Sequence, residues 1–246
     1  VERNTSRMLR LVNQILDFRK IQNKKMKMQV QRVDVVPFIR KVMDNFEAVA
    51  EEHRIDFLFE TEKQHLYLWV DADKLEKIVF NLLSNAFKYT PSNGTIILSV
   101  SVDEARKTLQ IQVSDTGVGI PKEKQNELFK RFMQSNFSGD SIGVGLHLSH
   151  ELVQVHKGTI KYSDNEGGGS VFTVSIPTDK SAYNEKDFLI PGNALLKDAN
   201  MHAAHLAESV DFSEEGQELA ELEKVDNPLN KRKILIIEDD NDIRQY

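Results

Sequence analysis

The stretch DKLEKIVFNLLSNAFKYTP, residues 73–91, contains the strongest helix signal in the chain. Apolar side chains recur in it at helical spacing, at Leu75, Val79, Leu82 and Ala86. Asp73, followed three residues later by Glu76, matches the capping box that begins many helices. Because such an amphipathic helix is stable only when its apolar face is covered, we expect it to pack on another layer.

The segments on both sides alternate between strand and helix patterns. Strands are predicted at 32–36, 55–60, 66–70, 95–102, 108–114, 158–162 and 170–176, and helices at 37–50, after Pro121 and at 144–156. The helices and strands come in runs rather than in strict alternation. We therefore expect an α/β (α+β) two-layer sandwich whose mixed, largely antiparallel sheet is covered by helices on one face.

Composition is that of a folded domain with an acidic segment. The chain has 246 residues, 40% of them hydrophobic, no cysteine and a net charge of −6, and it has no apolar run long enough to span a bilayer. Residues 179–230 hold 12 acidic and 4 basic side chains, which indicates a linker. Residues 1–28 predict a helix with an apolar face at Met8, Val12 and Ile15 and a basic opposite face. Nucleic acid is one interpretation of that basic face, but the absence of interleaved aromatics favours a solvated face of a helical bundle.

Three groups of polar residues and glycines are candidates for a site. Asn81, Asn85 and Lys88 fall on one stripe of the central helix, where they would bind Mg²⁺ and phosphate or simply face water. Asp115 continues the inward parity of its strand and precedes a glycine loop; it would bind an exocyclic amine such as that of adenine or belong to an ordinary turn. Further glycine loops at 143–145 and 167–169 would present backbone N–H groups to phosphate or form flexible turns. His147 and His150 are predicted to face solvent, which argues against a metal site there.

In their order along the chain these motifs resemble the five boxes of the ATP-binding domain of sensor histidine kinases, a GHKL or Bergerat-type domain. The resemblance covers residues 32–178. The matching segments are NLLSNAFKYTP (81–91), DTGVGIP (115–121), LFKRF (128–132), GVGL (143–146) and GGGSVF (167–172).

This resemblance implies that the domain binds ATP and Mg²⁺. It assigns the adenine amino group to Asp115, Mg²⁺ to Asn85, and phosphates and sugar to Asn81, Lys88 and Tyr89, with Asn81 and Lys88 as catalytic residues. The other residues that it implies for ATP binding are Gly117, Gly119, Ile120, Phe132, Gly143, Val144, Gly145, Leu146 and Ser170, with a lid over 132–142.

The resemblance also implies what the domain does with ATP. Relatives that hydrolyse ATP use a glutamate to activate water where this chain has Asn81. An amide cannot act as a general base, so transfer of the γ-phosphoryl group to a protein histidine is favoured. The alternatives are a GHKL-type ATPase and a non-catalytic module that senses nucleotide.

The flanking segments extend the resemblance to a hybrid two-component sensor. Residues 1–28 resemble part of the second helix of the dimerisation and histidine-phosphotransfer bundle, and 233–246 resemble the truncated start of a receiver domain, joined by an acidic linker at 179–232. The expected partners are a second copy through the bundle helices and a receiver domain as phosphoryl acceptor, with no nucleic acid. The acceptor histidine is expected outside this chain, and the domain is expected in the cytoplasm, within a protein anchored in the inner membrane.

Overall fold

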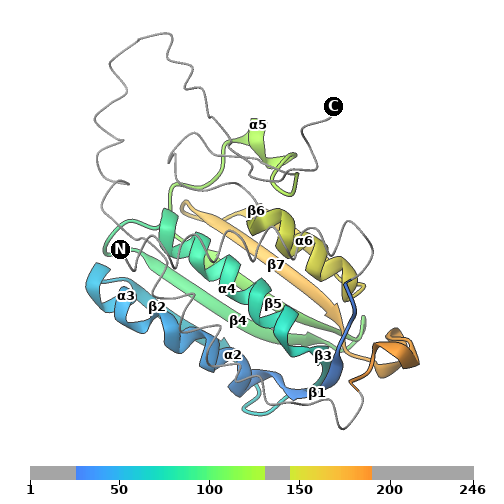
Figure 1. The fold of residues 1–246 in the computed structure, drawn as a ribbon. Helices are drawn as coiled ribbons and strands as arrows, with labels where there is room; N and C mark the ends of the chain where they lie inside the picture. The colour runs from blue at the N-terminus through green and yellow to red at the C-terminus, as the bar shows by residue number, and fades with distance from the viewer. Residues whose placement is uncertain (1–25, 131–144, 190–246) are drawn as a thin grey trace, which may run out of the picture.

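A five-stranded mixed sheet forms one layer of the domain. The computed structural model describes residues 26–130 and 145–189 (Figure 1). In spatial order the strands are β2 (Asp56–Thr61), β4 (Thr95–Asp103), β5 (Thr108–Asp115), β7 (Ser170–Pro177) and β6 (Thr159–Asp164). Only β2 and β4 are parallel within this sheet, and the other three pairs are antiparallel. The expected mixed, largely antiparallel sheet is confirmed.

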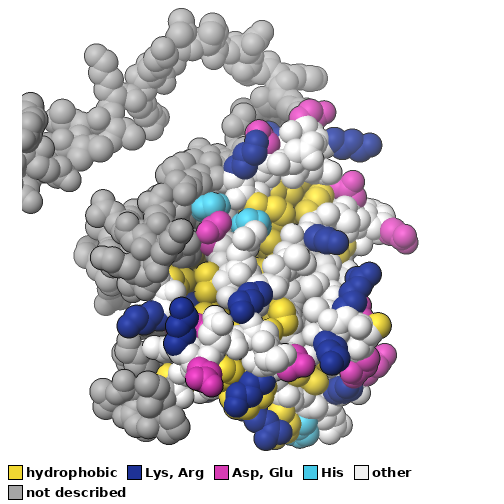
Figure 2. All heavy atoms as spheres, turned by 90° about the vertical axis from the view of Figure 1, so that its right-hand side faces the viewer, with side chains coloured by type: hydrophobic (Ala, Val, Ile, Leu, Met, Phe, Trp, Pro, Cys, Tyr) yellow, Lys and Arg dark blue, Asp and Glu magenta, His cyan; other side chains and the backbone are white. Residues whose placement is uncertain are grey.

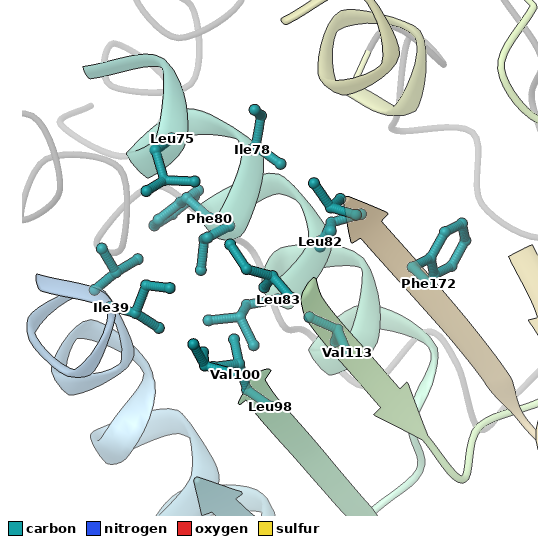
Figure 3. Close-up of a cluster of buried hydrophobic side chains, with 14 of the residues drawn as sticks. Ile39, Leu75, Ile78, Phe80, Leu82, Leu83, Leu98, Val100, Val113 and Phe172 are labelled. Atoms are coloured by element: carbon teal, nitrogen blue, oxygen red, sulfur yellow. The ribbon is translucent and has the colours of Figure 1, made fainter. Parts of the chain in front are cut away.

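Helices cover one face of the sheet, as expected. They are α2 (Val35–Met43), α3 (Glu47–His53), α4 (Ala72–Tyr89) and α6 (Gly145–Val155), with α4 between α2 and α6 (Figure 1). The predicted apolar stripe of α4 is fully buried, since Leu75, Val79 and Leu82 have no exposed surface. Figure 3 shows Leu82 and Leu83 of α4 close to side chains of the sheet such as Val113. This shared core fixes α4 on the sheet.

The predicted helix at 37–50 is interrupted. A 3₁₀ turn, η1 (Asp44–Phe46), separates α2 from α3. The Asn45 side chain donates from Nδ2 to the carbonyl oxygens of Lys41 at 3.2 Å and Val42 at 3.0 Å, and such bonds to i−4 and i−3 carbonyls compete with regular helix hydrogen bonds. Phe46 then anchors the turn, with its ring centroid 5.0 Å from that of Phe80 and 5.2 Å from that of Phe87.

The capping box predicted at Asp73 and Glu76 is wrong. Strand β3 (Tyr67–Asp71) ends at Asp71, whose extended backbone makes it the N-cap of α4, and its Oδ1 accepts from the backbone N of Lys74 at 3.2 Å. Asp71 is buried, and its Oδ2 also accepts from Lys74 Nζ at 2.6 Å and from the backbone N of Gln29 at 2.7 Å. The cap is therefore the last extended residue, which the residue types alone did not reveal.

Strand β3 pairs not with the main sheet but with β1 (Val30–Asp34), as an antiparallel two-stranded sheet. Residues 179–189, the first part of the predicted linker, pack beside it through the 3₁₀ turns η2 (Lys180–Ala182) and η3 (Glu185–Asp187). Leu189 N donates to Val30 O at 2.9 Å, and the Phe188 ring meets that of Trp69 edge-on at 5.4 Å. The packed unit thus extends to residue 189, because aromatic contacts hold a segment whose composition looked like a linker.

The remaining fold expectations concern surface and termini. Pro121 precedes only a four-residue helix, α5 (Lys122–Gln125), and is its N-cap rather than its first residue. Among the described residues no helix is both long and apolar enough to cross a membrane. On the face seen in Figure 2, basic and acidic side chains are interspersed. Residues 1–25 of the predicted bundle helix, most of the linker and the receiver strand lie outside the described residues, and residues 26–28, the predicted end of that helix, are not helical.

Candidate functional site

The candidate site is centred on Asp115, the last residue of β5. Its side chain points inward with Leu109, Ile111 and Val113, as the strand parity predicted, and is only 4% exposed. Oδ1 accepts from the backbone N–H groups of Gly117 at 2.9 Å and Ser170 at 3.2 Å. Both bonds end on the same oxygen, so neither occupies Oδ2. A buried carboxylate is thereby held in one orientation by backbone donors from two different glycine motifs.

Burial shifts the pKa of this carboxylate. The pKa of Asp115 is raised above its ordinary value, mainly because burial penalises the charged form, while the hydrogen bonds from Gly117 and Ser170 act in the opposite direction. The two donors therefore offset part of the desolvation cost. An acceptor of this kind suits a neutral N–H donor, such as an exocyclic amine.

The glycine loop after Asp115 lies directly on the C-terminal end of α4. Val118 N donates to Tyr89 O at 3.3 Å, and a β-carbon on Gly117 would lie 2.4 Å from that same oxygen. Only glycine fits so close to a helix carbonyl. Gly119 has a φ of +68°, a conformation that other L residues rarely adopt. The loop therefore needs both of its glycines, Gly117 for its close packing on α4 and Gly119 for its backbone conformation.

The hairpin before β7 closes the other side of Asp115. A β-carbon on Gly169 would lie 2.0 Å from Asp115 O, and that oxygen also accepts from Asn165 Nδ2 at 2.8 Å. Ser170, predicted to contact ATP, is 6% exposed and uses its backbone N–H to bind Asp115. Its contribution within the domain is to position the carboxylate. Asn165 was not predicted, because an asparagine in a glycine-rich turn signals only the turn.

Ile120 is held at the edge of the same site. Its side chain packs against the main core, and its carbonyl accepts from Gln125 Nε2 at 2.9 Å. The same Gln125 amide nitrogen donates to Asp164 Oδ1 at 2.9 Å. The last residue of α5 is thus tied to both the loop and the hairpin, which makes one connected rim around Asp115.

The polar stripe of α4 runs from this rim toward α6. Asn81, Asn85, Lys88 and Tyr89 are all half-buried, and Lys88 Nζ lies 5.4 Å from the centroid of the Tyr89 ring. With a rise of about 1.5 Å per residue, the stripe from Asn81 to Lys88 is about 10 Å long. That length is comparable to a chain of phosphate groups, with the adenine-type acceptor Asp115 next to its Tyr89 end.

The first turn of α6 meets this stripe at Asn81. Asn81 Nδ2 lies 3.5 Å from Gly145 O and 3.3 Å from Ser149 Oγ. Leu146 is half-buried against the core, and the N-terminal end of α6 carries the partial positive charge of the helix dipole. The structure thus brings together the predicted Asn81, Asn85, Lys88, Tyr89, Asp115, Gly117, Gly119, Ile120, Gly145, Leu146 and Ser170. Phe132, Gly143 and Val144, and the expected lid, lie outside the described residues.

The prediction that His147 and His150 both face solvent is wrong for His147. That side chain is buried at 9% exposure, and its Nδ1 lies 2.8 Å from Phe129 O. The half-buried His150 stacks on the Phe129 ring at 5.5 Å. Both histidines thus hold residue 129 against α6, a role that the helical stripe alone did not indicate. In the described part of the chain, no group of three or more His, Cys, Asp or Glu side chains is arranged to hold a metal ion.

The chain is similar in sequence to known proteins. A family model described as histidine kinase-, DNA gyrase B-, and HSP90-like ATPase matches residues 70–180. Histidine kinase P4 of Formosa agariphila is 30% identical over 254 residues, covering 100% of this chain and 18% of its own length. Sensor histidine kinase TmoS of Ectopseudomonas mendocina is 34% identical over 255 residues, covering 100% of this chain and 25% of its own length. The chain thus spans a quarter or less of either relative.

A solved structure has the same fold. The catalytic domain of histidine kinase ThkA is 27% identical, with a TM-score of 0.58, and the match covers 63% of this chain and 100% of that one. The family model includes α4, the Asp115 loop, α6 and the Gly169 hairpin, which together form the candidate site. Residues 70–180 of this chain therefore belong to the ATP-binding catalytic domain of the sensor histidine kinase family.

Proposed function

We propose that this domain binds Mg-ATP and transfers the γ-phosphoryl group to a histidine side chain outside the domain. The observation that carries the proposal is the buried Asp115 carboxylate, held by Gly117 and Ser170 at one end of a stripe of amides and an ammonium on α4. In such a site the base of a nucleotide would contact the carboxylate, and its phosphates would contact the amides and the ammonium.

Asp115 supplies the base preference in this proposal. A carboxylate oxygen accepts a hydrogen bond from the amino group of adenine, whereas guanine presents a carbonyl oxygen at the same ring position, which a carboxylate repels. Because Asp115 is buried, that repulsion is only weakly screened by solvent. We therefore expect ATP to bind more tightly than GTP.

The α4 stripe binds the phosphates. The amide oxygens of Asn81 and Asn85 are hard ligands of the type that Mg²⁺ prefers, and the Lys88 ammonium neutralises phosphate charge. Bound Mg²⁺ would be held by Asn85 and would reduce the charge repulsion met by an incoming nucleophile. Gly145 and Leu146 place the N-terminal end of α6 beside the same phosphates.

The identity of residue 81 favours phosphoryl transfer over hydrolysis. The Asn81 amide cannot take a proton from water. A neutral histidine needs no such base, because one of its imidazole nitrogens bears no proton and can attack without losing one. In the proposed step that nitrogen forms a bond to the γ-phosphorus while the bond from phosphorus to the ADP oxygen breaks. Homodimerisation through the 1–28 helix, a receiver domain as the next phosphoryl acceptor, and membrane anchoring of a longer protein belong to the same proposal.

Calorimetry on this chain tests the nucleotide site. We expect Mg-dependent ATP binding that is tighter than GTP binding, and loss of that preference in Asp115→Asn. Asp103→Asn removes the same charge at the opposite end of the β4–β5 pair and serves as the matched control. Failure of the wild-type chain to bind either nucleotide would refute the site.

Labelling tests the reaction. In a longer form of the protein that includes the acceptor histidine, we expect [γ-³²P]ATP to label histidine and Asn85→Ala to abolish the label. Unchanged labelling in Asn85→Ala would contradict its role. Steady release of inorganic phosphate without labelled histidine would instead support an ATPase.

A further inference from the structure

Ser149 on α6 carries a buried hydroxyl, which contacts Asn81 of the proposed phosphate site from the α6 side. The residue has no exposed surface, and its Oγ lies 3.3 Å from Nδ2 of Asn81, across the contact between α6 and α4. Placing a hydroxyl in a core is costly unless it makes hydrogen bonds. Its burial is also unexpected, because Ser149 follows Leu148 in sequence and so lies about 100° away from that apolar side chain around the helix. The contact with Asn81 gives this buried hydroxyl a polar partner.

The contact determines which end of the Asn81 amide faces α6. Asn81 Nδ2 also lies 3.5 Å from the carbonyl oxygen of Gly145, and a carbonyl oxygen can only accept hydrogen bonds. The NH₂ group must therefore point toward α6. Turning the amide by 180° would place its oxygen against the Gly145 carbonyl and lose both N–H contacts.

The amide oxygen lies on the side of Asn81 where a side chain at the first residue of α6 would come. A β-carbon on Gly145 would be 3.9 Å from Asn81 Oδ1, so glycine at this position leaves the oxygen uncovered by a side chain. Oδ1 is the atom that would accept from or coordinate a group in the phosphate site. The direction of Oδ1 is set by the hydrogen bonds that hold Nδ2 of the same amide.

We propose that Ser149 is a positioning residue: it accepts the Asn81 amide N–H and so keeps Asn81 Oδ1 turned toward the metal of the bound nucleotide. The inference rests on the proposed function. It assigns to Ser149 no contact with ATP, and every effect of Ser149 on the nucleotide should pass through Asn81.

A double-mutant cycle measured by calorimetry on this chain tests the idea. We expect Ser149→Ala to weaken Mg-ATP binding by about tenfold, the effect of losing one well-placed hydrogen bond, and to leave metal-free ATP binding within about twofold. In the Asn81→Ala background the same substitution should have almost no further effect, because its only target is gone. Ser149→Thr keeps the hydroxyl and should retain most of the affinity.

Ser175→Ala is the matched control, because it removes a serine hydroxyl that donates to Gln110 Oε1 at 3.0 Å elsewhere in the same domain. We expect this variant to bind Mg-ATP like the wild type. Additive losses in the double mutant, or wild-type affinity in Ser149→Ala, would overturn the positioning role. Absence of ATP binding by the wild-type chain would instead overturn the proposed function, so the two failures are distinguishable.

Discussion

Gly169 and Gly168 allow the closure of the nucleotide site to be tested with a nearly matched pair of substitutions. Both have strongly positive φ, +104° for Gly169 and +107° for Gly168, so alanine is similarly strained at either position. They differ in their surroundings. A β-carbon on Gly168 meets nothing within 4 Å, whereas one on Gly169 would lie 2.0 Å from Asp115 O and 2.7 Å from its carbonyl carbon.

The expected magnitudes follow from these contacts. The shared backbone strain costs about 1–3 kcal/mol in either alanine variant. In Gly169→Ala, the start of β7 must in addition move by about 1 Å to reach a normal contact distance, which stretches the Ser170 to Asp115 hydrogen bond well beyond its range. Loss of that bond and of the Asn165 bond to Asp115 O adds about 2–5 kcal/mol. At roughly 2–4 °C per kcal/mol, Gly169→Ala should melt about 5–15 °C below Gly168→Ala.

Thermal unfolding and calorimetric ATP binding would be measured on both variants and the wild type. We expect Gly168→Ala to bind ATP with near wild-type affinity, because its β-carbon meets no atom within 4 Å. Gly169→Ala should lose ATP binding even at temperatures where it remains folded, because the Asp115 carboxylate is displaced. Equal melting temperatures and equal affinities in the two variants would refute the argument that close packing of the hairpin positions Asp115.

Two further predictions concern stability. Burial, with a contribution from Asp73, raises the pKa of Glu76 to about 7 from an ordinary value of 4.5. Because Glu76 binds its proton more readily in the folded state, that proton stabilises the folded state at low pH. The free energy of unfolding should therefore fall as the pH rises from about 4.5 to above 7. Urea unfolding of Glu76→Gln should show a weaker fall over this range, and an unchanged slope would contradict the assignment. Phe188→Ala should lower the free energy of unfolding by about 1–3 kcal/mol, because the half-buried ring packs on Trp69. The control for hydrogen exchange is Phe57→Ala, which removes a half-buried ring of the main core. We expect faster amide exchange at residues 26–34 in Phe188→Ala and not in Phe57→Ala. Unchanged exchange at 26–34 in Phe188→Ala would show that residues 180–189 do not hold β1.

The local sequence pattern was sufficient to predict which side chains are buried where a single periodicity decides it. The alternation along β5 placed Asp115 on the inner face with Ile111 and Val113, since strand parity leaves no other choice. Helical spacing placed Leu75, Val79 and Leu82 in the core for the same reason. The helix cap failed as a prediction because Asp71 and Asp73 are equivalent as residue types, and only the end of β3 decides which one is extended.

The sequence by itself determined the layered fold and the order of the glycine motifs, because both depend on residue periodicity and on the conformational freedom of glycine. The tertiary structure decided which residues those motifs contact. The pairing of β5 with β7 brings Ser170 to Asp115 across 55 positions of the chain, and the packing of α4 on α6 brings Ser149 to Asn81 across 68 positions. It also attaches residues 180–189 to β1, although their acidic composition predicted a linker. Contacts between distant segments depend on how the layers pack, and no local pattern encodes that packing.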